Sequence, residues 1–186
     1  YLLAPICFQE DDTTTVKLLL DTGAALPLLL FSNTNSKIQV PEKVIAGNIG
    51  MGLGGYLEGF IGRIQGLAIG NVQQKYILTY FQKIDTAQDL TYLNNRNGLV
   101  GNRLLNRFQV VIDYDRGYLW LKASKNYRQR YVFDRSGLSI IAGGVTLNQF
   151  TVQGVVPGTP AAAAGLLPGD RILRIGGMPA VMLGLP

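Results

Sequence analysis

The apolar run Val16-Lys17-Leu18-Leu19-Leu20 ends directly in Asp21-Thr22-Gly23. This order predicts a β-strand that fixes a carboxylate at its end, followed by a small hydroxyl residue and a glycine that lets backbone approach closely. The same tripeptide is also common in simple turns, so taken alone it leaves a plain turn as the alternative interpretation. Other segments of the chain must decide between the two.

Two such segments follow in the sequence. Leu99-Val100-Gly101 places two apolar residues before a glycine, and a short amphipathic stretch with apolar Leu104 and Leu105 comes next. Between this segment and Asp21 lies a stretch rich in glycine, from residue 48 to residue 59. Together with Asp21-Thr22-Gly23, these segments resemble the single-lobed, retropepsin-like branch of the aspartic protease superfamily, of bacterial type.

That resemblance implies a mainly β fold with a closed, retropepsin-like barrel. Leu99-Val100-Gly101 would cross beneath the loop that carries Asp21, and residues 102–107 would form a short helix. The glycine-rich stretch would be a flap hairpin that closes over substrate. Its substrate-binding residues would be Gly52, Leu53, Gly54, Gly55 and Tyr56.

Composition limits the chemistry that is available. The chain has 186 residues, 47% of them apolar, which suits one domain plus a fragment or two small domains. It contains no histidine, which excludes the familiar serine and cysteine hydrolases and removes the commonest zinc ligand. The single cysteine, Cys7, lies in an apolar run and is expected to be a core residue. Hydrolysis would therefore rest on carboxylates, with no metal and no cofactor.

The net charge of +5 is concentrated in one stretch that also carries Tyr127 and Tyr131, namely Lys122, Lys125, Arg128, Arg130 and Arg135. Cations interleaved with aromatic residues can bind nucleic acid. A run of charges is more often a solvated connector, and no nucleic-acid module surrounds this one. We therefore expect a basic connector over residues 124–134 and no nucleic-acid partner. We also expect no membrane-spanning segment, because the most apolar window, Leu18 to Phe31, is short and interrupted.

The connector separates two different patterns. Before it, Asp115-Arg116-Gly117 lies between two runs of strand-forming residues and predicts a hairpin, after which the first domain ends at residue 123. After it, the segments Val156-Pro157-Gly158-Thr159-Pro160-Ala161 and Pro168-Gly169-Asp170-Arg171-Ile172-Leu173 resemble a PDZ domain. We expect a partial PDZ domain over residues 135–186, because the sequence stops before the second helix and last strand of that family. Its carboxylate-binding loop would be Gly137, Leu138, Ser139 and Ile140, with Ser139 in place of a common glycine.

The resemblance also implies a mechanism. Two carboxylates held against each other share a proton, so one can act as a base towards water while the other supports the developing oxyanion. The sequence holds one Asp-Thr-Gly, so we expect a homodimer in which Asp21, with Thr22 and Gly23, faces its own copy. The expected function is an aspartic endopeptidase of the cell envelope, periplasm or secreted fraction, whose PDZ module delivers substrate or regulates cleavage. The alternative is a peptide-binding scaffold without turnover.

Overall fold

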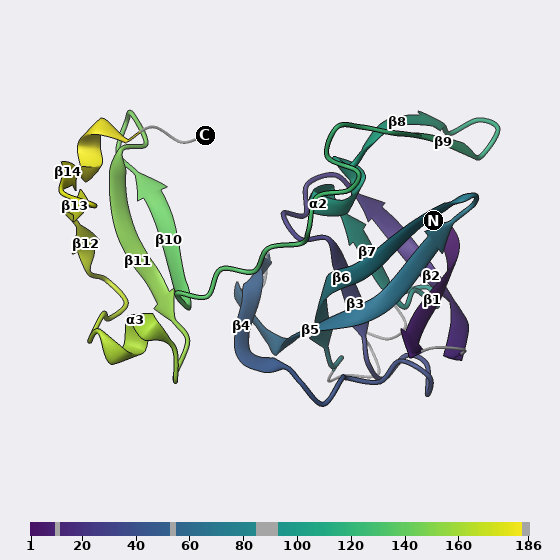
Figure 1. The fold of residues 1–186 in the computed structure, drawn as a ribbon, viewed down its shortest axis with the longest axis horizontal. Helices are drawn as coiled ribbons and strands as arrows, with labels where there is room; N and C mark the ends of the chain where they lie inside the picture. Colours follow the sequence, from purple (N-terminus) through teal and green to yellow (C-terminus); the bar gives the residue numbers. More distant parts are fainter. Residues whose placement is uncertain (10–11, 53–54, 85–92, 184–186) are drawn as a thin grey trace. The chain divides into compact units, whose positions relative to one another are not determined.

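The computed structural model describes residues 1–9, 12–52, 55–84 and 93–183. The chain divides into two compact units, Tyr1–Val132 and Phe133–Pro186. In both units β-strands are the predominant regular structure (Figure 1). In the parts of the chain that the structure describes, no helix has the length and apolar character needed to cross a membrane.

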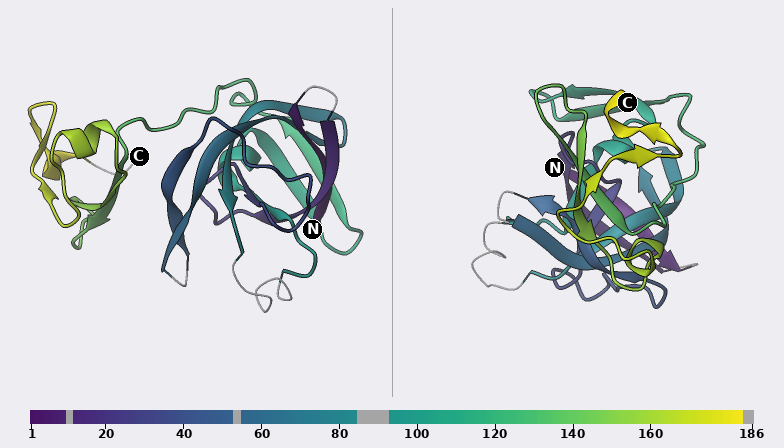
Figure 2. Two further views of the ribbon diagram at one scale, coloured as in Figure 1. Left: turned by 90° about the horizontal axis from the view of Figure 1, so that it is seen from below. Right: turned by 90° about the vertical axis from the view of Figure 1, so that its left-hand side faces the viewer.

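The first unit is a closed barrel. Its strands follow the order β1-β2-β7-β3-β6-β5, and β5 returns to β1 through the antiparallel pairs Ile6–Leu67 and Cys7–Gly66. The ring of strands is visible in the left view of Figure 2. A further strand, β4, pairs with β5 outside the ring. The seven strands are β1 (Leu2–Gln9), β2 (Asp12–Asp21), β3 (Leu28–Phe31), β4 (Ile45–Gly52), β5 (Gly55–Ile69), β6 (Val72–Gln82) and β7 (Gly98–Gly101).

Alternate side chains of the strands fill the barrel. Val16 and Leu18 on β2 are fully buried, as are Ala4 and Ile6 on β1, whereas their sequence neighbours face outward or are half-buried. This period of two is what an apolar interior imposes on a strand. Strand β3 differs, because all four of its residues are buried. It lies between β6, to which it is parallel, and β7, to which it is antiparallel, and it separates the barrel interior from a second apolar cluster.

A short helix and a hairpin follow β7. The helix α2 (Asn102–Leu105) buries Leu104 and Leu105, and the hairpin consists of β8 (Phe108–Asp113) and β9 (Tyr118–Ala123). Gly117 has a φ of +68°, which suits a glycine at the end of this turn, and the N–H of Arg116 donates to Asp113 Oδ1 at 3.0 Å. The hairpin forms a two-stranded sheet of its own, apart from the barrel strands (Figure 1). The hairpin expected from the sequence is therefore present.

The residues after the hairpin, 124–132, form a segment that we call the strap. The Tyr127 hydroxyl donates to the carbonyl of Gln73 at 2.9 Å, and the Tyr131 hydroxyl donates to Gln74 Oε1 at 3.0 Å. Burial raises the pKa of Tyr131, which keeps this hydroxyl protonated and able to donate. The first part of the stretch expected to be a solvated connector thus packs on the barrel through its tyrosines.

Three arginines of the first unit complete the attachment of the strap. Arg107 is 6% exposed, and its Nη1 donates to the carbonyls of Asn126, Tyr127 and Gln129. Its guanidinium also lies 3.6 Å from the centroid of the Tyr131 ring. Arg63 donates to the carbonyl of Tyr131 at 2.7 Å, and Arg103 to that of Val132 at 3.2 Å. Backbone carbonyls that no strand pairs with are thereby satisfied.

The second unit contains a three-stranded sheet in the order β10-β11-β12 and a two-stranded sheet, β13-β14. Thr159 precedes the helix, and Pro160 occupies its first turn, where the missing N–H of proline costs nothing. The elements are β10 (Leu138–Gly143), β11 (Gln149–Val155), α3 (Pro160–Ala163), β12 (Arg171–Ile172), β13 (Arg174–Ile175), β14 (Met178–Pro179) and the 3-10 helix η1 (Ala180–Met182).

Candidate active site

Asp21 is the last residue of β2, and its carboxylate is held by the loop that follows. The N–H groups of Gly23 and Ala24 donate to Asp21 Oδ1 at 2.9 and 3.1 Å. A β-carbon on Gly23 would lie 3.4 Å from the same oxygen, so the loop is closely wrapped around the carboxylate. No described residue donates to Oδ2. The side chain is half-buried, so one oxygen is fixed by backbone while the other remains available to a reactant.

Strand β7 and the residue after it are hydrogen-bonded to this loop. It runs parallel to β2, with Asp21 opposite Gly101. The N–H of Gly101 donates to the carbonyl of Pro27 at 3.0 Å, and the N–H of Asn102 donates to that of Ala24 at 2.8 Å. A β-carbon on Gly101 would lie 2.1 Å from the carbonyl oxygen of Leu26, a distance that only glycine permits. The crossing strand expected at Leu99-Val100-Gly101 is thus in place, and α2 follows it.

Asn97 connects β2 to the beginning of β7, and no local sequence pattern indicates this role. Its backbone N–H donates to the carbonyl of Lys17, and its side-chain Oδ1 accepts from the N–H of Lys17, both at 2.8 Å. Its Nδ2 donates to Thr34 Oγ1 at 3.1 Å. One asparagine therefore links β2, the segment after β3 and the start of β7. Its two partner residues, Lys17 and Thr34, are distant in the sequence, which is why no motif marks it.

The glycine-rich stretch forms a hairpin, as expected for the flap. Strands β4 and β5 pair antiparallel, with Met51 opposite Tyr56 and Gly52 opposite Gly55. A bulge interrupts the pairing between Asn48 and Gly50. The remaining predicted flap residues, Leu53 and Gly54, lie outside the described residues. The backbone of Gly52, Gly55 and Tyr56 is thus at the end of the hairpin.

An apolar cluster joins the loop after Asp21 to the base of the flap. Leu29, Phe31 and Leu93 are its buried members. Half-buried side chains from the Asp21 loop, the flap strand, β6 and β7 pack against them, namely Leu26, Leu57, Ile61, Tyr80, Ile84 and Leu99. Burial raises the pKa of Tyr80, and nearby Arg103 opposes that shift. We call this cluster the apolar wall; single-residue motifs did not reveal it.

Thr22 is exposed, and among the described residues its hydroxyl has no hydrogen-bond partner. The position expected for it, beside Asp21 and facing its own copy, needs a second subunit and stays a prediction. Leu26, from the loop that follows Asp21-Thr22-Gly23, and Leu57, from the flap strand, pack against the same buried cluster. The third group of predicted site residues lies in the second unit.

In that unit, Gly137 has a φ of +70°, and a β-carbon there would lie 2.2 Å from Thr159 Oγ1, so only glycine fits. The carbonyl of Gly137 accepts from the N–H of Val156 at 2.9 Å. The N–H of Leu138 donates to Ser136 Oγ at 3.1 Å, so in this conformation that group is not free to receive a carboxylate. Ser139 and Ile140 are exposed on β10, which is the edge strand of its sheet among the described residues.

Two comparisons with known proteins gave a match. Residues 151–184 match the family model of the PDZ domain. The chain is similar to the crystal structure of a retropepsin-like aspartic protease from Rickettsia conorii, with 22% identity over 61% of this chain and 76% of that one, at a TM-score of 0.43. No curated protein matches the chain. The predicted fold class, mainly β with a closed barrel followed by a PDZ domain, is confirmed.

Proposed function

We propose that the protein is an aspartic endopeptidase whose catalytic pair is assembled from two copies of the chain. The observation that carries this proposal is the loop of Asp21, in which two backbone N–H groups fix Oδ1 and leave Oδ2 without a partner among the described residues. A single carboxylate in water is a weak base, whereas two that share a proton divide the roles of base and acid. Water would lose its proton to the ionised Asp21 as it attacks the peptide carbonyl.

The apolar wall supports a preference among substrates. Leu26 and Leu57 reach the cluster from the Asp21 loop and the flap strand, the two segments that would flank an extended peptide. Apolar side chains next to the cleaved bond would bury against them and gain about 1.5–3 kcal/mol each. We therefore propose cleavage between apolar residues. Digestion of a peptide library, read by mass spectrometry at several acidic and neutral pH values, tests this. Absence of cleavage in a protein shown to be dimeric would favour the scaffold.

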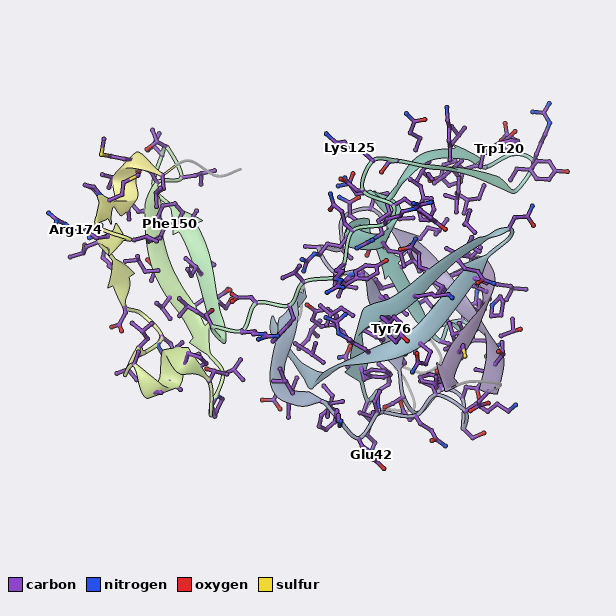
Figure 3. All side chains as sticks on the ribbon, in the orientation of Figure 1. Glu42, Tyr76, Trp120, Lys125, Phe150 and Arg174 are labelled. Carbon is purple, nitrogen blue, oxygen red and sulfur yellow. The ribbon has the colours of Figure 1, made fainter. Side chains whose placement is uncertain are left out.

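The outer face of the hairpin is the surface that we assign to dimerisation. Val111 and Trp120 lie opposite each other on it, and the ring of Tyr118 is tilted against that of Trp120 with centroids 5.6 Å apart. All three are more than half exposed, at 60%, 51% and 58% (Figure 3 labels Trp120). The hairpin begins soon after Gly101, the partner of Asp21 in the sheet. An apolar face so close in the chain to the half-site suits a two-fold contact that brings two such sites together.

We expect Trp120→Glu to weaken the dimer and, with it, cleavage at low protein concentration. Losing a central aromatic residue from an interface commonly costs more than about 1.4 kcal/mol, which is a tenfold rise in the dissociation constant. Sedimentation velocity measures that constant, and specific activity should recover as the protein concentration is raised. Tyr114→Glu is the matched control, because Tyr114 lies in the turn of the same hairpin and is 85% exposed. Full activity in a monomeric particle would contradict this proposal.

We propose that the second unit binds the C-terminal ends of polypeptides along β10. An edge strand can accept one more strand, and Ile140 and Ile141 are 41% and 44% exposed on it. A peptide with a free C-terminal carboxylate is expected to bind roughly tenfold more tightly than the same peptide with an amidated end, because charge-assisted hydrogen bonds to the carboxylate are lost. Fluorescence anisotropy with the two labelled peptides measures this difference. Equal affinities would exclude recognition of the chain end.

A further inference from the structure

The strap and the barrel enclose a hollow that is strongly basic. Its volume is about 620 Å³, within the range of small-molecule sites. No acidic residue is among those that line it, whereas five cationic side chains are, namely Arg63, Lys75, Arg107, Arg128 and Arg130. A second hollow of about 240 Å³ shares Arg107 and Arg130 and adds Arg103. So many like charges raise the free energy of the folded chain unless an anion offsets them.

Two of these cations stabilise the fold. Arg63 and Arg107 hold carbonyls of the strap, which makes the frame of the hollow rigid. Lys75, Arg128 and Arg130 are exposed, and their side chains make neither a hydrogen bond nor an ion pair with any described residue. Packing therefore explains the first two cations and leaves the other three without a role in the fold.

Two further observations point to a ligand. Arg107 is 6% exposed, and its Nε has no hydrogen-bond partner among the described residues, whereas its Nη1 donates to three carbonyls of the strap. Tyr76 has a φ of 50°, an uncommon conformation for an aromatic residue, and its side chain is 63% exposed. Arg63 maintains this conformation by donating to the Tyr76 carbonyl at 2.9 Å. Strained backbone that a neighbour holds in place is typical of binding sites.

From this arrangement we infer that the hollow binds a phosphate-bearing ligand, with the phosphate group between Lys75, Arg128 and Arg130. Guanidinium groups match the oxygen geometry of phosphate, and an ammonium adds a point charge. A phosphate group near neutral pH carries between one and two negative charges, so it offsets several cations better than a single carboxylate does. The ring of Tyr76 (Figure 3) supplies an apolar surface for the organic part of such a ligand.

The test uses the whole chain and inorganic phosphate, followed by ³¹P NMR and calorimetry at fixed ionic strength. We expect saturable binding that Arg128→Gln/Arg130→Gln weakens at least about tenfold. The matched control is Lys122→Gln/Lys125→Gln, which removes the same charge from the same stretch outside both hollows and should change binding little. Lys75→Gln, on the barrel, should weaken binding as well. Equal losses in test and control variants, or no saturable binding, would overturn the inference.

A second arm identifies the source of the phosphate. Vesicles of phosphatidylcholine with and without phosphatidic acid are mixed with the same variants and sedimented. The site binds a lipid headgroup if the protein sediments only with vesicles that contain phosphatidic acid. Arg128→Gln/Arg130→Gln should then abolish this cosedimentation, and the control variant should keep it. Binding of free phosphate without retention assigns it to a soluble ligand. A single-stranded oligonucleotide is the third probe. If it binds much more tightly than inorganic phosphate, and Arg128→Gln/Arg130→Gln weakens that binding, the ligand is nucleic acid and the inference is refuted.

Discussion

Asp21→Asn is expected to lower the rate of peptide cleavage at least about a thousandfold while the fold is retained. Asparagine cannot ionise, so neither half-site of the dimer could supply the base. Its side-chain oxygen can still accept the two hydrogen bonds that Gly23 and Ala24 donate at 2.9 and 3.1 Å, which keeps the loop in place. Cleavage of the preferred library peptide is measured beside circular dichroism and sedimentation.

The matched control for this variant is Asp12→Asn, because Asp12 is exposed at the beginning of the same strand. It should leave the cleavage rate unchanged. A folded, dimeric Asp21→Asn protein that cleaves at the original rate would refute the mechanism. Loss of activity in both variants would point to a general effect of charge on the barrel.

Gly101→Ala is expected to destabilise the barrel by more than about 3 kcal/mol. The new methyl group would lie 2.1 Å from the carbonyl oxygen of Leu26 and 2.8 Å from that of Ala24. Neither side can yield easily, since the N–H groups of Gly101 and Asn102 are bonded to the same loop. The loop that positions Asp21 would have to lift, so cleavage should fall together with the free energy of unfolding.

Equilibrium unfolding in urea measures this loss of stability. Gly66→Ala serves as the control, because its nearest contact would be the carbonyl oxygen of Gln74 at an ordinary 3.4 Å. That variant should stay within about 1 kcal/mol of the original protein. A Gly101→Ala protein as stable as the Gly66→Ala protein would show that the loop and β7 are less tightly joined than the structure indicates.

Local patterns predicted those parts of the molecule whose shape depends on neighbouring residues. In three places a few adjacent residues determine the local geometry. These are the strand end at Asp21-Thr22-Gly23, the turn at Gly117 and the start of α3 at Pro160. The hairpin of β4 and β5 was likewise visible in its glycines.

The contacts that the sequence did not reveal join distant residues. Arg63 reaches the carbonyl of Tyr131 across a separation of 68 residues, and the sequence pattern of neither residue indicates the other. For the basic stretch, the run of charges predicts a solvated connector. Its tyrosines and backbone carbonyls, which attach it to the barrel, become recognisable only when Arg107 and Gln74 are beside them.

The parallel pairing of β2 with β7 has a consequence for the order of folding. The N–H of Lys17 bonds to Asn97, 80 residues later, and Asp21 lies opposite Gly101. Contacts between such distant residues form slowly, and a ribosome adds only about 5–20 residues per second. Until β7 has been synthesised, the strand that ends in Asp21 lacks a neighbour on one side. The loop that orients this carboxylate is therefore completed near the end of barrel folding, so a nascent chain carries no finished half-site.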